Sequence, residues 1–346
     1  MQGRRQVDIN GCERGVRPRG GRDFVRRAFL RSGICAALAA FVPAHVQAQD
    51  ASLPPGPIKI VLPTAAGGQP DTIARLLADR VTPVINRTFV IEPRAGAGGL
   101  IAGEYVARAA PDGQTLLFVT GGHTILPGLY ARTIKFDAIK DFAFIAQISD
   151  VFFAIAVGPD HPAKTFGDLI ELSRRKEHTF SSTGTGSTQH LIGELLKQQL
   201  GLQWTHVPYP GGAAPLNDVM TGRVDISVDS LLRLVPLGES GKLRLLAVSS
   251  DKRNERLPNV PALGEFSPGL AVGSFLALAA PAGTPPAIVA RLNREIVKAL
   301  SAEDLKQRLV ALGNTPKTGS PEEVTALAAQ YVARWTGIIQ KLGIAH

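Results

Sequence analysis

Cysteine is scarce in this chain of 346 residues, which contains only Cys12 and Cys35. Both lie within residues 1–48, so the rest of the chain has no side chain for a disulfide, a cysteine nucleophile or a cysteine-bound metal. After residue 48 the chain also has no run of 18 consecutive apolar residues, and we expect no membrane-spanning helix there. At about 150 residues per domain, the length predicts two domains.

The net positive charge is also small outside residues 1–48. The whole chain carries a net charge of +9, but residues 1–48 hold nine arginines and only three acids. The remaining 29 bases and 26 acids give a net charge of +3. So small an excess gives little attraction for a phosphate backbone, and we expect no nucleic-acid partner.

Motifs for nucleotide, hydrolase and metal chemistry are absent as well. The sequence has no P-loop, no G-x-S-x-G elbow and no H-E-x-x-H pair. Gly184-x-Gly186 is followed by Gln189, where a dinucleotide fingerprint requires a small residue. The six histidines after residue 48 are scattered, without metal-ligand spacing. We therefore expect no cofactor, no metal site and no enzymatic activity.

Residues 1–48 have the three-part pattern of an export signal. A basic stretch ends in Arg26-Arg27-Ala28-Phe29-Leu30-Arg31, an apolar run follows at 34–42, and small residues precede a cleavage position near Ala48. The arginine pair and the residues after it resemble a twin-arginine signal, with an ordinary secretory leader as the alternative. We therefore expect an exported protein.

The rest of the chain alternates short apolar runs with helical periodicity, which predicts an α/β fold. Asp71 is expected to cap the first helix, Thr165 to start another, and Ser320 to Glu323 to form a capping box for the last, which would reach about Ile339. The expected strands cover residues 58–62, 89–91, 115–119, 144–146, 151–157, 180–182, 224–228, 243–248 and 275–279.

Two of these stretches are expected to run between lobes. The β-rich segment near 144–157 would leave a first lobe, and the strand at 275–279 would return to it. This predicts that residues 49–150 and 251–346 form one lobe and residues 151–250 the other. A ligand cleft would lie between the lobes, with hinges near 147–155 and 245–275.

Three strands are followed by turns of small residues that open helices, at 64–71, 96–99 and 184–188. A helix N-terminus has unpaired N–H groups and a partial positive charge, and glycine lets a ligand approach the backbone closely. Such a turn can bind a carboxylate or a phosphate without lysine or arginine. The alternative is that these turns only pack helix on sheet, as in many α/β proteins.

Four polar side chains near the expected cleft allow more than one interpretation. Asp229 ends a strand and would bind an amino or hydroxyl group of a ligand, whereas Asp225 would face solvent or hold a turn. His123 also ends a strand, and its contact with a ligand is left open. For His190, hydrogen bonding to nearby backbone is favoured over catalysis.

Several ordered motifs resemble those of one known family. They are Gly67-Gly68-x-x-Asp71-x-x-Ala74-Arg75, Arg94-x-Gly96-Ala97-Gly98-Gly99, Ser182-x-Gly184-x-Gly186-Ser187-x-x-His190-Leu191, His206-Val207-Pro208-Tyr209, and Ala280-Pro281-Ala282-Gly283-Thr284-Pro285. From about Ile58 to Ile339 the chain resembles the substrate-binding proteins of tripartite tricarboxylate transporters, also called Bug-type receptors.

The resemblance implies a periplasmic receptor with a two-lobed α/β fold of the type II, Venus-flytrap kind and a hinge of crossing strands. Such a receptor is expected to be a monomer that closes over a small carboxylate and delivers it to membrane transporter subunits or to a sensor. The ligand-binding residues implied here are Thr64, Ala66, Gly67, Gly68, Asp71, Thr120, Gly121, His123, Thr185, Gly186, Ser187, Thr188 and Asp229.

Two differences from the family pattern leave the identity of the acid open. Thr64 stands where an aromatic residue is frequent, and Ala66 where proline is frequent. The rival interpretation is an exported α/β hydrolase that uses Ser187 and His190 in the same cleft. Closeness in sequence does not make a triad, and no orienting acid is evident beside them.

Overall fold

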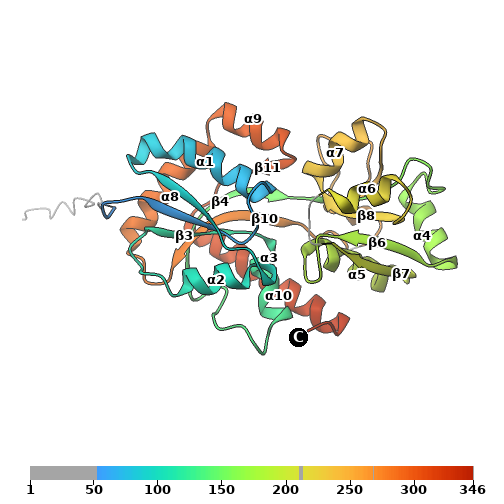
Figure 1. Cartoon of the computed structure of the whole chain (residues 1–346), viewed down its shortest axis with the longest axis horizontal. Helices are drawn as coiled ribbons and strands as arrows, with labels where there is room; N and C mark the ends of the chain where they lie inside the picture. The colour runs from blue at the N-terminus through green and yellow to red at the C-terminus, as the bar shows by residue number, and fades with distance from the viewer. Residues whose placement is uncertain (1–52, 210–212, 268, 346) are drawn as a thin grey trace, which may run out of the picture. The chain divides into compact units, whose positions relative to one another are not determined.

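The computed structural model describes residues 53–209, 213–267 and 269–345. The expected export signal at residues 1–48 lies outside the described residues. The described part contains two β-sheets surrounded by helices, as the α/β pattern predicts (Figure 1).

The first sheet has six strands in the order β11-β4-β10-β3-β1-β2. Strand β1 pairs in parallel with β2 and β3, whereas β10 pairs in antiparallel fashion with β3 and β4. Because β1, β2 and β3 are parallel, the turns that follow them leave the same edge of the sheet. The strands are β1 (Ile58–Leu62), β2 (Phe89–Pro93), β3 (Thr115–Val119), β4 (Phe142–Val151), β10 (Ser274–Pro281) and β11 (Asn314–Pro316).

The second sheet has five strands in the order β7-β6-β8-β5-β9. Strands β6, β7 and β8 are parallel, and β5 is antiparallel to both β8 and β9. The carboxyl ends of β6, β7 and β8 therefore share one edge. The strands are β5 (Phe153–Val157), β6 (His178–Ser182), β7 (Trp204–Pro208), β8 (Ile226–Ser230) and β9 (Arg244–Val248).

The chain passes from the first sheet to the second after β4 and returns to the first after β9. Only Phe152 separates β4 of the first sheet from β5 of the second. Residues 249–273 lead from β9 back to β10. The second sheet is thus built from one continuous stretch of chain, whereas the first sheet contains strands that precede this stretch in the sequence and strands that follow it.

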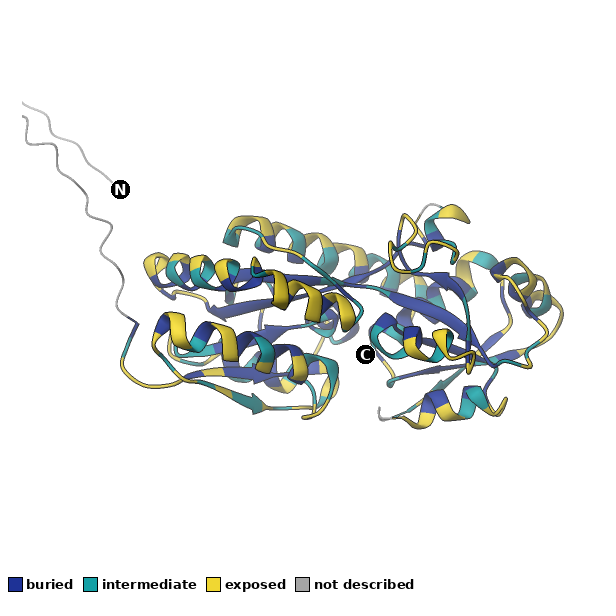
Figure 2. Cartoon of the chain, turned by 90° about the horizontal axis from the view of Figure 1, so that it is seen from above, coloured by how far each residue is buried: buried dark blue, intermediate teal, exposed yellow. Residues whose placement is uncertain are grey.

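Apolar side chains fill both faces of each sheet, and Figure 2 shows the strands mostly buried and the helices exposed along one side. All five residues of β8 and all eight of β10 are buried, Ser227 and Asp229 included. The helices are α1 (Gln69–Ile85), α2 (Leu100–Ala107), α3 (Gly121–Leu129), α4 (Phe166–Arg175), α5 (Thr188–Leu200), α6 (Ala214–Met220), α7 (Leu231–Glu239), α8 (Pro286–Leu300), α9 (Glu303–Ala311) and α10 (Pro321–Leu342).

The helix starts show where local sequence decides structure. The starts of α4 at Thr165 and of α10 at Ser320 are confirmed, as is the capping box predicted at Ser320. Thr165 also forms a reciprocal capping box, which was not predicted. The last helix continues to Leu342, beyond the expected end. The prediction that Asp71 caps α1 is wrong, because Gly68 is the N-cap and Asp71 lies in the first turn. Its carboxylate instead accepts the N–H of Gly67, outside the helix.

Among the residues described, no helix combines the length and the apolar character needed to cross a membrane.

Candidate ligand-binding site

The turn between β1 and α1 is held by an acidic side chain. The Gly67 N–H donates to Asp71 Oδ2 at 2.9 Å, and Arg75 Nη2 lies 2.9 Å from Asp71 Oδ1. The hydrogen bonds from Arg75 and from Gly67 lower the pKa of Asp71, so its carboxylate stays ionised in the buried first turn. Asp71 therefore acts on the shape of the turn, and its negative charge is already matched within the chain.

The rest of this turn offers exposed backbone beside one buried hydroxyl. Ala66 and Gly67 are exposed, and Gly67 has a left-handed φ of +81° that favours glycine. The hydroxyl oxygen of Thr64 is buried and has no hydrogen-bond partner among the described residues. A buried hydroxyl without a partner is destabilising unless something else satisfies it, so Thr64 is suited to contact a polar group of a ligand.

The turn between β6 and α5 is tied together by its own side chains. Ser187 is the N-cap of α5, and its hydroxyl accepts the His190 N–H at 3.2 Å. Gly184 and Gly186 adopt φ angles of +123° and +79°. Thr185 is exposed and Thr188 is buried at the first helical position. Because Ser187 takes the His190 N–H, the N–H groups of Thr188 and Gln189 are the ones without a carbonyl partner within the helix, and they are available to an anion.

The N-terminus of a third helix, α3 of the first sheet's half, lies against this turn of the second sheet's half. Thr120 is the N-cap of α3, which follows β3 in the first sheet. A methyl group built on Gly121 would lie 2.8 Å from Thr188 Oγ1 and 2.3 Å from Ser274 Oγ. One built on Gly186 would lie 2.4 Å from Leu129 of α3. Thus the structure brings together the predicted residues at 120–121 and those at 186–188.

The turn after β1 is connected to the second sheet by other contacts. Gln69 Nε2 donates to Asn314 Oδ1 at 3.2 Å, and Asn314 belongs to β11. The neighbouring Gly313 approaches the backbone of Leu232, in the first turn of α7. The start of α1 and the start of α7 therefore contact two adjacent residues, Asn314 and Gly313, at the beginning of β11.

Asp229 is a buried carboxylate that already has partners within the chain. Its Oδ1 accepts the Ser230 N–H at 2.7 Å, and its Oδ2 lies 2.8 Å from Arg233 Nη1. Burial raises its pKa, and the nearby guanidinium, the Ser230 N–H and a hydrogen bond from Gln189 oppose that rise. Because Gln189 follows Thr188, the carboxylate lies beside the first turn of α5. The expectation that Asp225 faces solvent or holds a turn is wrong, because its Oδ2 accepts both the N–H and the hydroxyl of Thr179 and so joins the start of β8 to the neighbouring strand β6.

The ring of His123 lies in the core. It packs against Phe136, Phe142 and Phe144, and Nε2 lies 2.8 Å from the Ala138 carbonyl oxygen. Burial lowers its pKa to about 4, so the ring is neutral at pH 7. We assign the ring a packing role.

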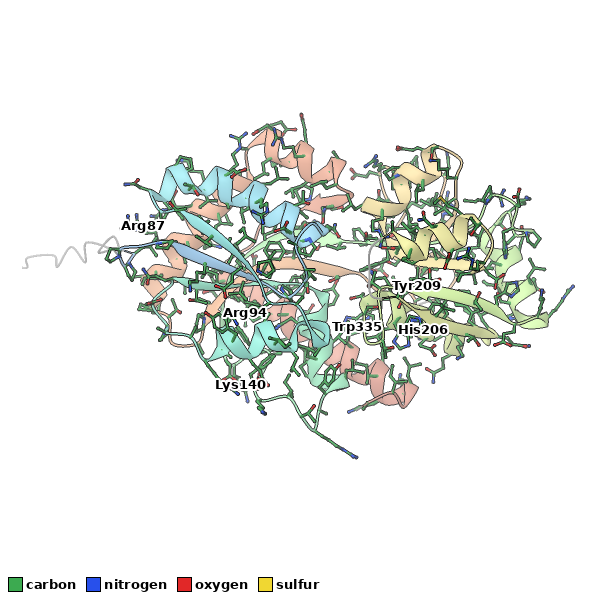
Figure 3. All side chains as sticks on the ribbon, in the orientation of Figure 1. Arg87, Arg94, Lys140, His206, Tyr209 and Trp335 are labelled. Atoms are coloured by element: carbon green, nitrogen blue, oxygen red, sulfur yellow. The ribbon has the colours of Figure 1, made fainter. Side chains whose placement is uncertain are left out.

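Ser187 and His190 do not form the nucleophile and base of a hydrolase. The Ser187 hydroxyl is bonded to the His190 main chain, and the His190 Nδ1 accepts the Gly186 N–H at 3.1 Å. His190 thus bonds to nearby backbone, as favoured from the sequence. The partner that sequence reasoning did not single out is His206 on β7, which is labelled in Figure 3. Its ring stacks on that of His190.

Two surface hollows of about 420 and 570 Å³ lie away from these turns, and no predicted site residue lines either one. In the described part of the chain, no cluster of three or more His, Cys, Asp or Glu side chains is arranged to hold a metal ion. The chemistry gathered at the turns is that of backbone N–H groups, hydroxyls and neutralised carboxylates, which suits binding of an anion.

The chain has two β-sheets flanked by helices and joined by crossing strands, and helix N-termini come together between the sheets. This is the architecture of a periplasmic solute-binding protein. The family model of the tripartite tricarboxylate transporter family receptor matches residues 73–344, and the chain belongs to this family. A UPF0065 protein of Bordetella bronchiseptica is 33% identical over 307 residues, covering 89% of this chain and 91% of that protein.

Solved structures give the same assignment. The periplasmic binding protein BugD is 32% identical, with a TM-score of 0.76 over 84% of this chain and 99% of BugD. Rpa4515 of R. palustris, solved with adipate, is 34% identical with a TM-score of 0.77 over the same shares of the two chains. The chain is therefore a solute-binding receptor of the Bug type, and the hydrolase alternative finds no support.

Proposed function

We propose that this receptor captures a small organic acid at the helix N-termini that follow β1, β3 and β6. The observation that carries the proposal is the close approach of Gly121 in α3 to Thr188 in α5. It brings two helix starts, with their unpaired N–H groups, to one place between the sheets. A carboxylate is the group that such a place binds best, and the adipate in the related Rpa4515 is a carboxylate.

The proposed contacts come from the predicted residues, with three revisions. The acid is bound by the backbone of the turns that follow β1, β3 and β6. It is also bound by the hydroxyls of Thr64, Thr185, Ser187 and Thr188. Asp71 shapes its turn, Asp229 lies at the border of the site, and His123 contributes only through its main chain. Residues 49–150 with 251–346, and residues 151–250, form the two lobes. They close about the segments near 147–155 and 245–275.

The same proposal covers the partners and the route of export. The closed monomer delivers its acid to subunits of a membrane transporter or to a sensor. Residues 1–48 direct export through a twin-arginine signal that is cleaved near Ala48. A family of transporter receptors and the arginine pair at 26–27 support these two statements.

The test is binding by residues 49–346 to acetate, succinate, adipate, malate, citrate, glutamate and benzoate. An acid present at 1,000 times its dissociation constant adds about 4 kcal/mol of stability, which raises the melting temperature by several degrees. Isothermal titration calorimetry then gives the affinity for each acid that shifts the melting temperature.

Two matched cap variants locate the site. Ser187→Ala and Ser320→Ala each remove a helix N-cap and each cost about 1 kcal/mol of stability. Only Ser187→Ala weakens the binding of the acid, because Ser320 starts α10 and is not a predicted site residue. Equal weakening in both variants, or the absence of binding by any acid to folded protein free of co-purified ligand, contradicts the proposal.

A further inference from the structure

Two histidine rings stack against each other next to the turn between β6 and α5. The ring centroids of His190, in the first turn of α5, and His206, on β7, lie 4.0 Å apart at an interplanar angle of 26°. Phe180 of β6 packs against both rings. Neither histidine is among the predicted ligand contacts, yet each is bonded to one end of the turn.

His190 fixes one glycine of the turn through an acceptor nitrogen. Its Nδ1 lies 3.1 Å from the Gly186 N–H, and that N–H donates, so Nδ1 carries no proton. Gly186 has a φ of +79° and faces Leu129 of α3. The bond therefore sets the orientation of the peptide that leads into α5.

His206 supports the other end of the turn through a serine. Its Nε2 lies 2.6 Å from Ser182 Oγ, and the same oxygen accepts the Gly184 N–H at 3.1 Å. The Ser187 N–H donates to the Gly184 carbonyl at 3.1 Å. The turn is thus held at Gly184, Gly186 and Ser187 by bonds within the chain. The N–H groups that α5 cannot satisfy are left to a ligand.

Burial keeps both rings neutral, and the charged groups nearby have smaller effects. Glu194 Oε1 lies 4.0 Å from His190 Nε2, and Oε2 of the same carboxylate lies 3.5 Å from Lys197 Nζ. Burial is the main cause that lowers the pKa of both His190 and His206 to about 4. Lys197 lowers both pKa values further, and His190 also lowers that of His206.

We propose that His190 is a positioning residue for the bound acid: its neutral ring, stacked on His206, holds the Gly186 N–H and so keeps the start of α5 in the shape that binds a carboxylate. This rests on the proposed function. The role requires an acceptor at the position of Nδ1, and it requires no contact between the ring and the acid.

Asparagine tests that requirement, because its Oδ1 occupies nearly the position of Nδ1 and accepts the same N–H without titrating. The probe is adipate, or the acid of the panel that raises the melting temperature most. His190→Asn retains the wild-type dissociation constant at pH 7 within about threefold. His190→Leu, which has similar bulk and no acceptor, weakens binding at least tenfold. His178→Asn, at the opposite end of β6, leaves binding unchanged and serves as the control.

Imidazole NMR gives a second readout that a merely structural ring would not produce. Unbound His190 shows the tautomer with hydrogen on Nε2, and addition of the acid lowers its pKa because the bound turn needs the unprotonated Nδ1. Simple attraction between an anion and an imidazolium predicts the opposite sign, a raised pKa. A raised pKa on binding, or equal affinity in folded Asn and Leu variants, overturns this inference. In either case, binding of the acid by the wild type at pH 7 still supports the proposed function as a receptor. If no acid binds to the wild type at pH 7, the proposed function itself fails.

Discussion

Asp229 and Arg233 form an ion pair across one turn at the start of α7, with Oδ2 and Nη1 2.8 Å apart. The same arrangement occurs at the start of α1, where Asp71 and Arg75 are four residues apart and 2.9 Å from each other. The two pairs differ in exposure, since the Arg233 side chain is 26% exposed and that of Arg75 is 55% exposed. In both, an arginine in the first turns of a helix pairs with an aspartate four residues earlier, within the first turn for Asp71 and just before the N-cap for Asp229.

Removal of the arginine is expected to affect the two pairs unequally. Arg233→Met leaves the buried carboxylate of Asp229 without its cation and lowers the free energy of unfolding by about 3 kcal/mol at pH 7. Arg75→Met lowers it by less than about 1 kcal/mol, because water screens the more exposed pair. Urea denaturation of both variants measures the difference.

The pH dependence of the stability of Arg233→Met tests whether the unpaired charge of Asp229 causes the loss. Loss of the cation raises the pKa of Asp229 further, so the deficit of the variant shrinks as the pH falls and the carboxyl group becomes neutral. A deficit that is constant from pH 7 to pH 4, or equal losses in both variants, contradicts this account.

Gly121 is expected to tolerate no side chain. Gly121→Ala places a methyl group 2.3 Å from Ser274 Oγ and 2.8 Å from Thr188 Oγ1, and we expect a loss of about 2 kcal/mol from overpacking. Gly337→Ala is the control, because that position lies within α10 with open space around it and should gain up to about 1 kcal/mol. Thermal unfolding of the two variants should shift in opposite directions.

His123 is expected to make the protein less stable in acid. Its pKa of about 4 in the folded chain is below the usual 6.5, so the unfolded chain binds more protons between these values. The contribution is complete above pH 6.5 and falls by about 3 kcal/mol as the pH drops to 4. His123→Phe keeps the aromatic packing and removes the titration, so its unfolding free energy depends on pH less steeply, by about one proton. Equal slopes for variant and wild type between pH 4 and 6.5 exclude this role.

The Trp204 indole depends on one hydroxyl in the core. Its Nε1–H donates to Ser173 Oγ at 2.8 Å, and both side chains are buried. Ser173→Ala leaves that N–H without its acceptor and costs about 2 kcal/mol. Ser240→Ala, where the hydroxyl is exposed, should stay within about 0.5 kcal/mol of the wild type in urea denaturation.

The sequence revealed the elements whose signals are local. Alternation and short apolar runs indicated the strands other than β7 and β11, helical periodicity from Thr165 indicated α4, and a capping box indicated the start of α10. Helix α3 was not predicted from the sequence, because it contains four poor helix formers: Gly121, Gly122, Pro127 and Gly128. Tertiary packing explains their presence, since a methyl group on Gly128 would lie 2.8 Å from Ile339 of α10. The short helices α7 and α9 were also not predicted.

The candidate site was predictable to the level of its turns. Glycines after strands mark places where the backbone is open, and the family resemblance selected among them. The surroundings of individual side chains were not predictable, because they depend on distant segments. His123 lies among three phenylalanines that follow it by 13 to 21 residues, and His206 reaches Ser182 across 24 residues.

The continuous course of the second sheet has a consequence for the order of folding. Strands β5 to β9 are complete once residue 248 has been made, so this half can pair all its strands early. Strand β10 lies between β3 and β4 in the first sheet, and β11 pairs with the far side of β4. The first sheet must therefore wait for the last quarter of the chain, and β3 and β4 keep unpaired edges until then.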